Sequence, residues 1–372
     1  MLIRNAAVFT GDGFQRLDVR TAGGIITEIG SHLPQTNELL NECPCLEADG
    51  LYMLPGFVDI HVHGFAGTDV SDGSEESVLA LSKHLAAKGI TCFCPTTMTL
   101  PCEKLAAAVR AIGNSMGKEK GAHILGVHLE GPYISPERVG AQDKTAVRPP
   151  HRNEFRALQA LAPIELISAA PEVPGALEFA QETSCSCTIS VAHTSATYSE
   201  TVLGLESGFS HFTHLYNAMP PLHHREPGPI AAAFESRCAT AELICDGIHV
   251  SAPMLHLAFR ELGRDRAVVV SDAVSGAGAE LIHSAWYLPD GKTLAGSATN
   301  LFEEYRKLLS IGIAEATVIR ACTVNPARVV RKAEEIGSIA IGKRANFLLA
   351  DRHRNLIATY IGGVEYNAHV EI

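Results

Sequence analysis

Short apolar runs of strand length alternate with amphipathic stretches of helix length through the middle of the chain, from residue 53 to residue 335. Eight runs are typical of strands, at residues 52–64, 90–98, 122–131, 164–172, 187–195, 208–218, 240–250 and 267–276. Apolar residues at helical spacing predict helices between most of them, at 75–89, 151–161, 174–182, 198–206 and 252–263. Eight consecutive strand–helix units predict an α/β fold, a (β/α)8 TIM barrel.

Both ends of the chain show a different pattern, in which apolar and polar residues alternate with the period of a strand. Residues 17–30 are typical of a hairpin with a Gly-Gly turn, and residues 347–367 alternate around a second Gly-Gly pair. Two β-rich ends can pair with each other. We therefore predict a small β-sandwich domain made of residues 1–52 and 336–372, beside a catalytic barrel of residues 53–335.

Composition narrows the class of protein. The chain has 372 residues, of which 46% are hydrophobic, and a formal net charge of −11. Without a Lys/Arg-rich block we expect no nucleic-acid partner, and without an apolar run of about 18 residues we expect no membrane partner. The ten cysteines have no C-x-x-C spacing, and the first residues lack a signal-peptide pattern, so we expect a cytoplasmic protein with reduced, packing thiols.

Ionisable residues gather where the predicted strands end. They are His61, His63, Glu130, His193, His214, Asp246, His249 and Asp272. In a barrel all carboxyl ends of the strands meet on one face, where catalytic sites lie. Strand alternation also places His61 and His63 on the same side, so both can point at one ion.

Imidazole nitrogens with a carboxylate are good ligands for Zn²⁺ or Fe²⁺. Such an ion lowers the pKa of a bound water from about 15.7 towards about 7, and a nearby aspartate can take the remaining proton. Five candidate ligands, His61, His63, Glu130, His193 and His214, exceed what one tetrahedral ion needs. One ion, or two ions bridged by Glu130, both fit the pattern.

Each of these residues also has a structural interpretation. A single histidine at a strand end is more often hydrogen-bonded than metal-bound, and Asp272 alone is more often a strand-end cap. The H-x-H pair favours a metal site, because two inward imidazoles need something to bind. We expect His128 to lie behind the ligands, and His223 and His224 to be solvated in a proline-flanked loop.

Several motifs then carry a family resemblance. They are "PGFVDIHVHG" (55–64), "HLEGPYISPERVGAQ" (128–142), "VAHTSAT" (191–197), "FTHLYNAMPPLHHREPG" (212–228), "DGIHV" (246–250), "VVVSDAVSGAG" (268–278), "LAGSA" (294–298) and "NPA" (325–327). The first resembles the opening motif of the amidohydrolase superfamily. The whole series, in this order and through almost the whole chain, resembles the N-acetylglucosamine-6-phosphate deacetylase family.

The resemblance implies metal-dependent hydrolysis of N-acetyl-D-glucosamine 6-phosphate to D-glucosamine 6-phosphate and acetate. It implies that Glu130, His193 and His214 are metal ligands and that Asp272 is the general base and acid. It further implies that four residues hold the sugar phosphate, namely Asn217, Ala218, Arg225 and His249. In the family the arginine loop can reach a neighbouring subunit's site, so a homodimer is implied.

Two departures from some relatives are informative. Those relatives lack the first two histidines and use one ion, whereas His61 and His63 are present here and can bind a second. Some relatives have histidine where this chain has Gln142, which can donate a hydrogen bond to the acetyl carbonyl only as a neutral group. Glu130 also stands where other amidohydrolases bridge two ions through a carboxylated lysine.

Other functions remain open at this point. An N-acetylgalactosamine-6-phosphate deacetylase fits equally well, because no residue of the pattern reads the sugar 4-hydroxyl. A non-phosphosugar amidase, dihydroorotase-like or acting on acetylated amino acids, would keep the metal and lose the phosphate requirement. A non-catalytic sugar-phosphate sensor on the same barrel would lack a ligand or the base, and neither is missing here.

Overall fold

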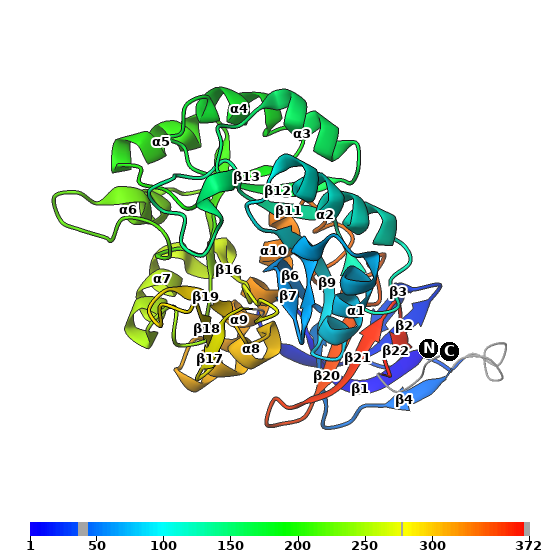
Figure 1. The fold of residues 1–372 in the computed structure, drawn as a ribbon. Coiled ribbons are helices and arrows are strands. Elements are labelled where there is room, and N and C mark those ends of the chain that lie inside the picture. Colours follow the sequence, from blue (N-terminus) through cyan, green and yellow to red (C-terminus); the bar gives the residue numbers. More distant parts are fainter. Residues whose placement is uncertain (36–43, 277, 368–372) are drawn as a thin grey trace.

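Two large sheets organise the computed structural model, which describes residues 1–35, 44–276 and 278–367. One sheet is the barrel of the middle segment, and the other joins the two ends of the chain. Figure 1 shows the barrel surrounded by helices and the second sheet beside it, with blue N-terminal strands next to red C-terminal strands.

The barrel contains all eight predicted strands. They are β6 (Phe57–Val62), β9 (Ile90–Thr97), β11 (Val127–Glu130), β12 (Ile164–Ala169), β13 (Thr188–Val191), β14 (Phe209–Phe212), β15 (Thr240–Leu243) and β16 (Ala267–Val269). Each is parallel to the next, and the short β10 (His123–Ile124) adds to β9. The last strand returns to the first, since Val62 bridges Ala273 and the Asp272 amide donates to the His61 carbonyl at 3.0 Å. The predicted (β/α)8 barrel is confirmed.

Helices cover the barrel as the apolar spacing predicts. They are α1 (Glu75–Ala86), α2 (Cys102–Ser115), α3 (Arg152–Gln159), α4 (Ala176–Thr183), α5 (Tyr198–Glu206), α6 (Gly228–Glu235), α7 (Ala252–Arg266), α8 (Leu301–Ser310), α9 (Glu315–Cys322) and α10 (Val324–Val329), with 3-10 turns η2 (Val70–Asp72) and η3 (Lys144–Ala146). The five predicted helices are present. Local signals start them: Thr197 and Glu200 form a capping box at α5, and the Ser74 side chain accepts from Ser77 at α1.

The barrel strands are buried on both faces. Every residue of β9 is buried, which is why this strand lacks the alternation of apolar and polar residues typical of a half-exposed strand. One core cluster lies between strands and helices, and a second includes Val58, Ile60 and Val268. The rigid layers fix the positions of the strand ends, and these ends carry the ionisable residues.

The terminal sheet contains strands from both ends of the chain. They are β1 (Leu2–Phe9), β2 (Phe14–Ala22), β3 (Ile25–Gly30), β4 (Cys45–Glu47), β5 (Tyr52–Pro55), β20 (Phe347–Ala350), β21 (Leu356–Ile361) and β22 (Val364–Glu365). The antiparallel pairing of β20 with β5 joins the C-terminal strands to the N-terminal ones, around a core cluster of the sheet's own. A separate sheet built from both termini is confirmed. Its predicted form as a β-sandwich and the domain limits at 52/53 and 335/336 stay predictions, and β5 carries the sheet to Pro55.

An antiparallel insertion follows the last barrel strand and is not among the predicted elements. It consists of β17 (Glu280–Ile282), β18 (Ala285–Tyr287) and β19 (Leu294–Ser297), and a second small sheet pairs β7 (Gly64–Phe65) with β8 (Thr68–Asp69). Ser297 also bridges Ala273, which ties the insertion to the barrel rim. Within the described residues, no helix has the length and apolar character needed to cross a membrane.

Candidate metal centre and active site

A cavity of about 230 Å³ opens at the carboxyl ends of the barrel strands. Nine of the eleven predicted site residues line it, namely His63, Glu130, Gln142, His193, His214, Asn217, Ala218, His249 and Asp272. His61 is 0% exposed and lies directly behind His63. Arg225 is exposed, is not among the described lining residues, and places its guanidinium 2.8 Å from the His224 ring.

The first half of the site comes from one strand. His61 and His63 are alternate residues at the end of β6, and their Nε2 atoms are 3.2 Å apart. Glu130, at the end of β11, places one oxygen 3.1 Å from His63 Nε2 and the other 3.4 Å from His61 Nε2. Asp272 Oδ1 is 3.4 Å from both of these nitrogens. We call His61, His63 and Glu130 the H-x-H group.

The second half comes from two further strands. His193 follows β13 and His214 follows β14, and their Nε2 atoms are 3.2 Å apart. Glu130 Oε1 is 3.3 Å from His193 Nε2 and 2.9 Å from His214 Nε2. We call Glu130, His193 and His214 the strand-end group. Glu130 thus belongs to both groups.

This donor set fits a divalent cation. In each group the three candidate ligand atoms lie within 4.8 Å of one another and all three residues are buried. The opposite ring nitrogens of His63 and His193 bond the backbone carbonyls of Thr96 (3.1 Å) and Arg138 (2.8 Å), which places the ring proton there. Their Nε2 lone pairs therefore face the centre, as bound imidazoles require.

The backbone at these positions is strained. His193, His214 and Asp272 have φ values of 44°, 29° and 45°, in the left-handed region that non-glycine residues rarely occupy. Tyr216 and Ala218, in the following loop, also have positive φ. Such outliers cluster at functional sites, where the surrounding structure enforces them.

The surroundings of two carboxylates in the site, Glu130 and Asp272, favour their ionised form. Burial opposes ionisation of Glu130, but the imidazoles of His61 and His193 outweigh it and hold its pKa well below the usual range. Burial likewise opposes ionisation of Asp272, and His61 with His63 lowers the Asp272 pKa below its ordinary value. Asp272 can therefore accept a proton.

Gln142 has a fixed orientation. Its amide oxygen accepts from the Thr99 backbone N–H at 2.6 Å, so its amide nitrogen must face the opposite way. That nitrogen donates to Glu130 Oε2. Gln142 lines the cavity, and its NH₂ group carries a second hydrogen besides the one donated to Glu130.

On the other side of the cavity His249 is held by Asp246. The ring Nδ1 lies 2.7 Å from Asp246 Oδ2, and the backbone N–H groups of Ile248 and His249 donate to Asp246 Oδ1 at 2.8 and 2.9 Å. The Asn217 backbone N–H donates to the His214 carbonyl at 2.9 Å. Asn217 and Ala218 thus lie against the strand-end group. Three of the four predicted phosphate-binding residues, Asn217, Ala218 and His249, share a cavity with it, and Arg225 is not among the described residues that line that cavity.

Two features of the site have no counterpart among the predicted residues. Glu242, in β15, is fully buried and contacts His61. The sequence does contain a signal for Glu242, because it is an acidic residue inside a predicted buried strand. A buried charge of this kind needs a partner. Residues 293–296 of the insertion also line the cavity, and the "LAGSA" motif overlaps them.

Comparison with known proteins places this site in a family. Residues 52–366 match the model of the "Amidohydrolase family". The chain is 31% identical to the N-acetylglucosamine-6-phosphate deacetylase of Lysinibacillus sphaericus, over 98% of this chain and 97% of that one. It is 30% identical to the N-acetylgalactosamine-6-phosphate deacetylase of Escherichia coli O157:H7, over 85% of this chain and 88% of that one.

A solved structure is similar over almost its whole length. It is a mutant of the N-acetyl-D-glucosamine-6-phosphate deacetylase of Mycobacterium smegmatis in complex with N-acetyl-D-glucosamine-6-phosphate, with a TM-score of 0.89 and 25% identity. The similarity covers 98% of this chain and 99% of that one, so both the barrel and the terminal sheet are included.

Proposed function

The chain belongs to the amidohydrolase family and, within it, to the N-acetylglucosamine-6-phosphate deacetylases, and from this premise we propose that it hydrolyses N-acetyl-D-glucosamine 6-phosphate to D-glucosamine 6-phosphate and acetate. One observation carries the proposal: Glu130 lies between two pairs of histidines, and Asp272 lies 3.4 Å from one pair. This arrangement suits metal-dependent hydrolysis of an amide in amino-sugar catabolism.

The candidate ligands are His61, His63, Glu130, His193 and His214. They would hold one or two divalent ions, Zn²⁺ or Fe²⁺, and such an ion acidifies a bound water and polarises the acetamide carbonyl. Asp272 Oδ1 accepts the proton of the attacking water and then returns it to the departing amine. Gln142 donates its free amide hydrogen to the acetyl oxygen as negative charge develops there.

The sugar phosphate is held at the other side of the cavity. His249, oriented by Asp246, and the Asn217–Ala218 segment face it. Arg225 lies in an exposed loop of its own subunit, which is consistent with a homodimer in which the arginine serves the neighbouring site. Nine described cysteines are free thiols, which supports action in the reducing cytoplasm.

The decisive experiment is acetate release from a panel of acetylated sugars. We expect turnover of N-acetylglucosamine 6-phosphate and a loss of at least tenfold in kcat/KM for unphosphorylated N-acetylglucosamine, because a charge-assisted contact contributes about 1.5–3 kcal/mol. N-acetylgalactosamine 6-phosphate is the second candidate substrate, given the 30% identical relative. Equal rates with and without phosphate would point to a non-phosphosugar amidase and contradict the proposal.

A matched variant locates the phosphate contact. His249→Asn should lower kcat/KM for the phosphorylated sugar by about 10–100-fold while leaving the slow unphosphorylated reaction unchanged. Equal losses on both substrates would place His249 at the reacting acetamide instead.

A further inference from the structure

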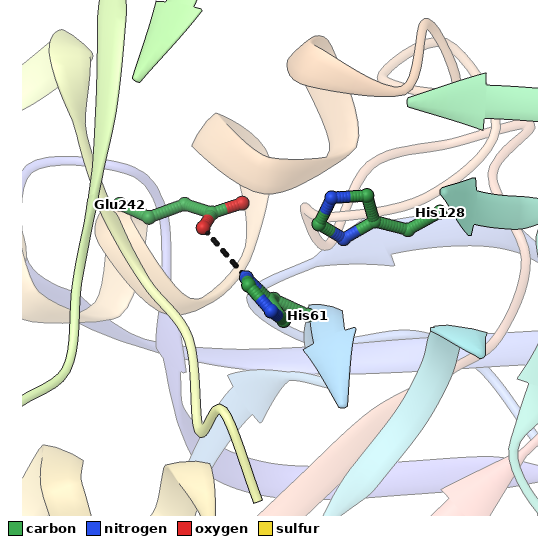
Figure 2. Close-up of side chains that lie close together, drawn as sticks. All are labelled: His61, His128 and Glu242. Atoms are coloured by element: carbon green, nitrogen blue, oxygen red, sulfur yellow. Dashed lines mark hydrogen bonds and ion pairs between the residues drawn. The ribbon is translucent and has the colours of Figure 1, made fainter. Parts of the chain in front are cut away.

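Glu242 is a carboxylate buried in the middle of β15, between Ala241 and Leu243, with 0% exposure. A buried charge without partners is strongly destabilising. The contacts of the Glu242 carboxylate therefore indicate its role. Oε2 accepts from His61 Nδ1 at 2.9 Å and from the His214 backbone N–H at 3.1 Å. Figure 2 shows the Glu242 carboxylate facing the His61 ring.

The other carboxylate oxygen is held in place from behind. Glu242 Oε1 accepts from His211 Nε2 at 3.2 Å. His211 Nδ1 in turn lies 2.6 Å from the Thr240 hydroxyl, which donates to it. Thr240 and Glu242 belong to the same strand, so the chain Thr240–His211–Glu242–His61 runs from β15 to the H-x-H group.

His61 is the exception among the candidate imidazole ligands. His63 and His193 direct Nδ1 at backbone carbonyls, while Nδ1 of His214 has no hydrogen-bond partner among the described residues. Among these four candidate ligands, in the contacts that the structure describes, only His61 directs Nδ1 at a negative side chain. A carboxylate partner fixes the tautomer and ring orientation and makes the opposite nitrogen more basic.

His61, His128 and Glu242 also lie close enough together to resemble a metal site. Hydrogen bonds account for their polar atoms without an ion. His128 Nδ1 donates to the Ile60 carbonyl at 3.0 Å and His128 Nε2 accepts from the Ser168 hydroxyl at 2.8 Å. His128 packs edge-on against His61, with ring centroids 4.6 Å apart, and lies beside it (Figure 2).

We infer that Glu242 is a positioning residue, which fixes His61 with Nε2 directed at the metal position and thereby sets the metal affinity of the H-x-H group. The same oxygen bonds the His214 backbone, so Glu242 also holds the two ligand groups in register. This inference rests on the metal-dependent function proposed above.

The test is metal binding by Glu242→Gln, measured without substrate. Chelator competition with Zn²⁺ gives the affinities and elemental analysis gives the ions per chain. We expect the affinity of the ion at the H-x-H group to fall about 10–100-fold. The control is Glu304→Gln, because Glu304 is 1% exposed but contacts Thr299 and the Cys245 amide rather than a candidate ligand, so its metal affinity should match the parent.

A double variant separates positioning from a general loss of stability. If Glu242 acts mainly through His61, Glu242→Gln should lower the metal affinity much less in a His61→Asn background than in the parent. Additive losses would overturn the inference, as would equal affinities in Glu242→Gln and the parent. A parent chain that binds no divalent ion would instead overturn the proposed function.

If Glu242→Gln does not fold, Thr240→Val provides a milder change at the far end of the chain of contacts. Removing the hydroxyl frees His211 and should weaken binding at the H-x-H group by a few fold. An affinity identical to the parent would overturn the inference.

Discussion

The rim of the barrel and the terminal sheet both contain left-handed backbone, but they use different residues for it. At the rim, His193, His214 and Asp272 have positive φ. In the terminal sheet the hairpin turn between β2 and β3 uses Gly23 and Gly24, for which this conformation costs little. A glycine at these rim positions would avoid a conformational cost, since each left-handed L-residue costs about 1–2 kcal/mol. The rim nevertheless has residues with functional side chains there. The choice of residues at these rim positions therefore follows from the chemistry of their side chains and not from the conformational preference of the backbone.

Two exceptions in and beside the terminal sheet support this interpretation. Arg354 has φ 60°, and its guanidinium lies 3.6 Å above the Tyr52 ring and pairs with Glu315. Asn5 also has φ 60°, and its backbone N–H donates to Asp18 at 2.9 Å. At Arg354 and Asn5, polar contacts therefore hold the left-handed backbone, and at the rim we infer that the metal and substrate do the same.

Among changes at the rim that leave the metal bound, Asp272→Asn is expected to have the largest effect. The amide cannot accept the proton of the attacking water, so kcat should fall by about 10²–10⁴-fold while metal content stays near that of the parent. Acetate release and elemental analysis measure the two quantities. Asp265→Asn, on the surface of α7, is the control and should retain activity; normal turnover in Asp272→Asn would reject the assigned role.

The second prediction is that loss of one ligand has a larger effect on metal content and activity in the strand-end group than in the H-x-H group. His214→Asn removes a ligand of the strand-end group and should abolish both metal binding and activity. His61→Asn should leave an ion at the strand-end group and reduce kcat by about tenfold, within the range that one displaced ligand partner produces. The test is to measure the number of ions per chain and kcat for both variants under the same conditions. The larger loss is expected for His214→Asn. Equal losses would mean that the groups form one indivisible site.

The smallest effect is expected in the terminal sheet. Gly24→Ala places a side chain at φ 80°, where the added Cβ has space but the backbone is strained. Denaturant unfolding should show a loss of about 1 kcal/mol, and kcat should be unchanged. A loss of activity in this variant would show that the sheet takes part in catalysis.

The sequence predicts most of the fold because the barrel repeats one simple pattern. The barrel strands are short and mostly buried, and the helices between them carry apolar residues at helical spacing. The H-x-H pair is equally local, since strand alternation alone directs both imidazoles to one side. The antiparallel insertion carries no such pattern, because its three short strands are partly exposed.

The remaining parts of the site depend on contacts between distant segments. Glu242 is 181 residues from His61 in sequence, and only the closed barrel brings them to 2.9 Å. Gln142 is predicted as a substrate donor, yet its bond to Glu130 follows from the position of Thr99, which no sequence pattern reveals. Arg225 lies away from its own cavity, so its predicted role depends on a second subunit.

Metal removal tests the central claim most directly. Acetate release from N-acetylglucosamine 6-phosphate would be measured for the purified chain, after dialysis against a chelator, and after addition of Zn²⁺ or Fe²⁺, with elemental analysis at each step. Convergence of four imidazoles on Glu130 predicts one or two ions per chain, loss of turnover in the stripped protein and recovery on addition. Full turnover by a chain that contains no metal would contradict the account.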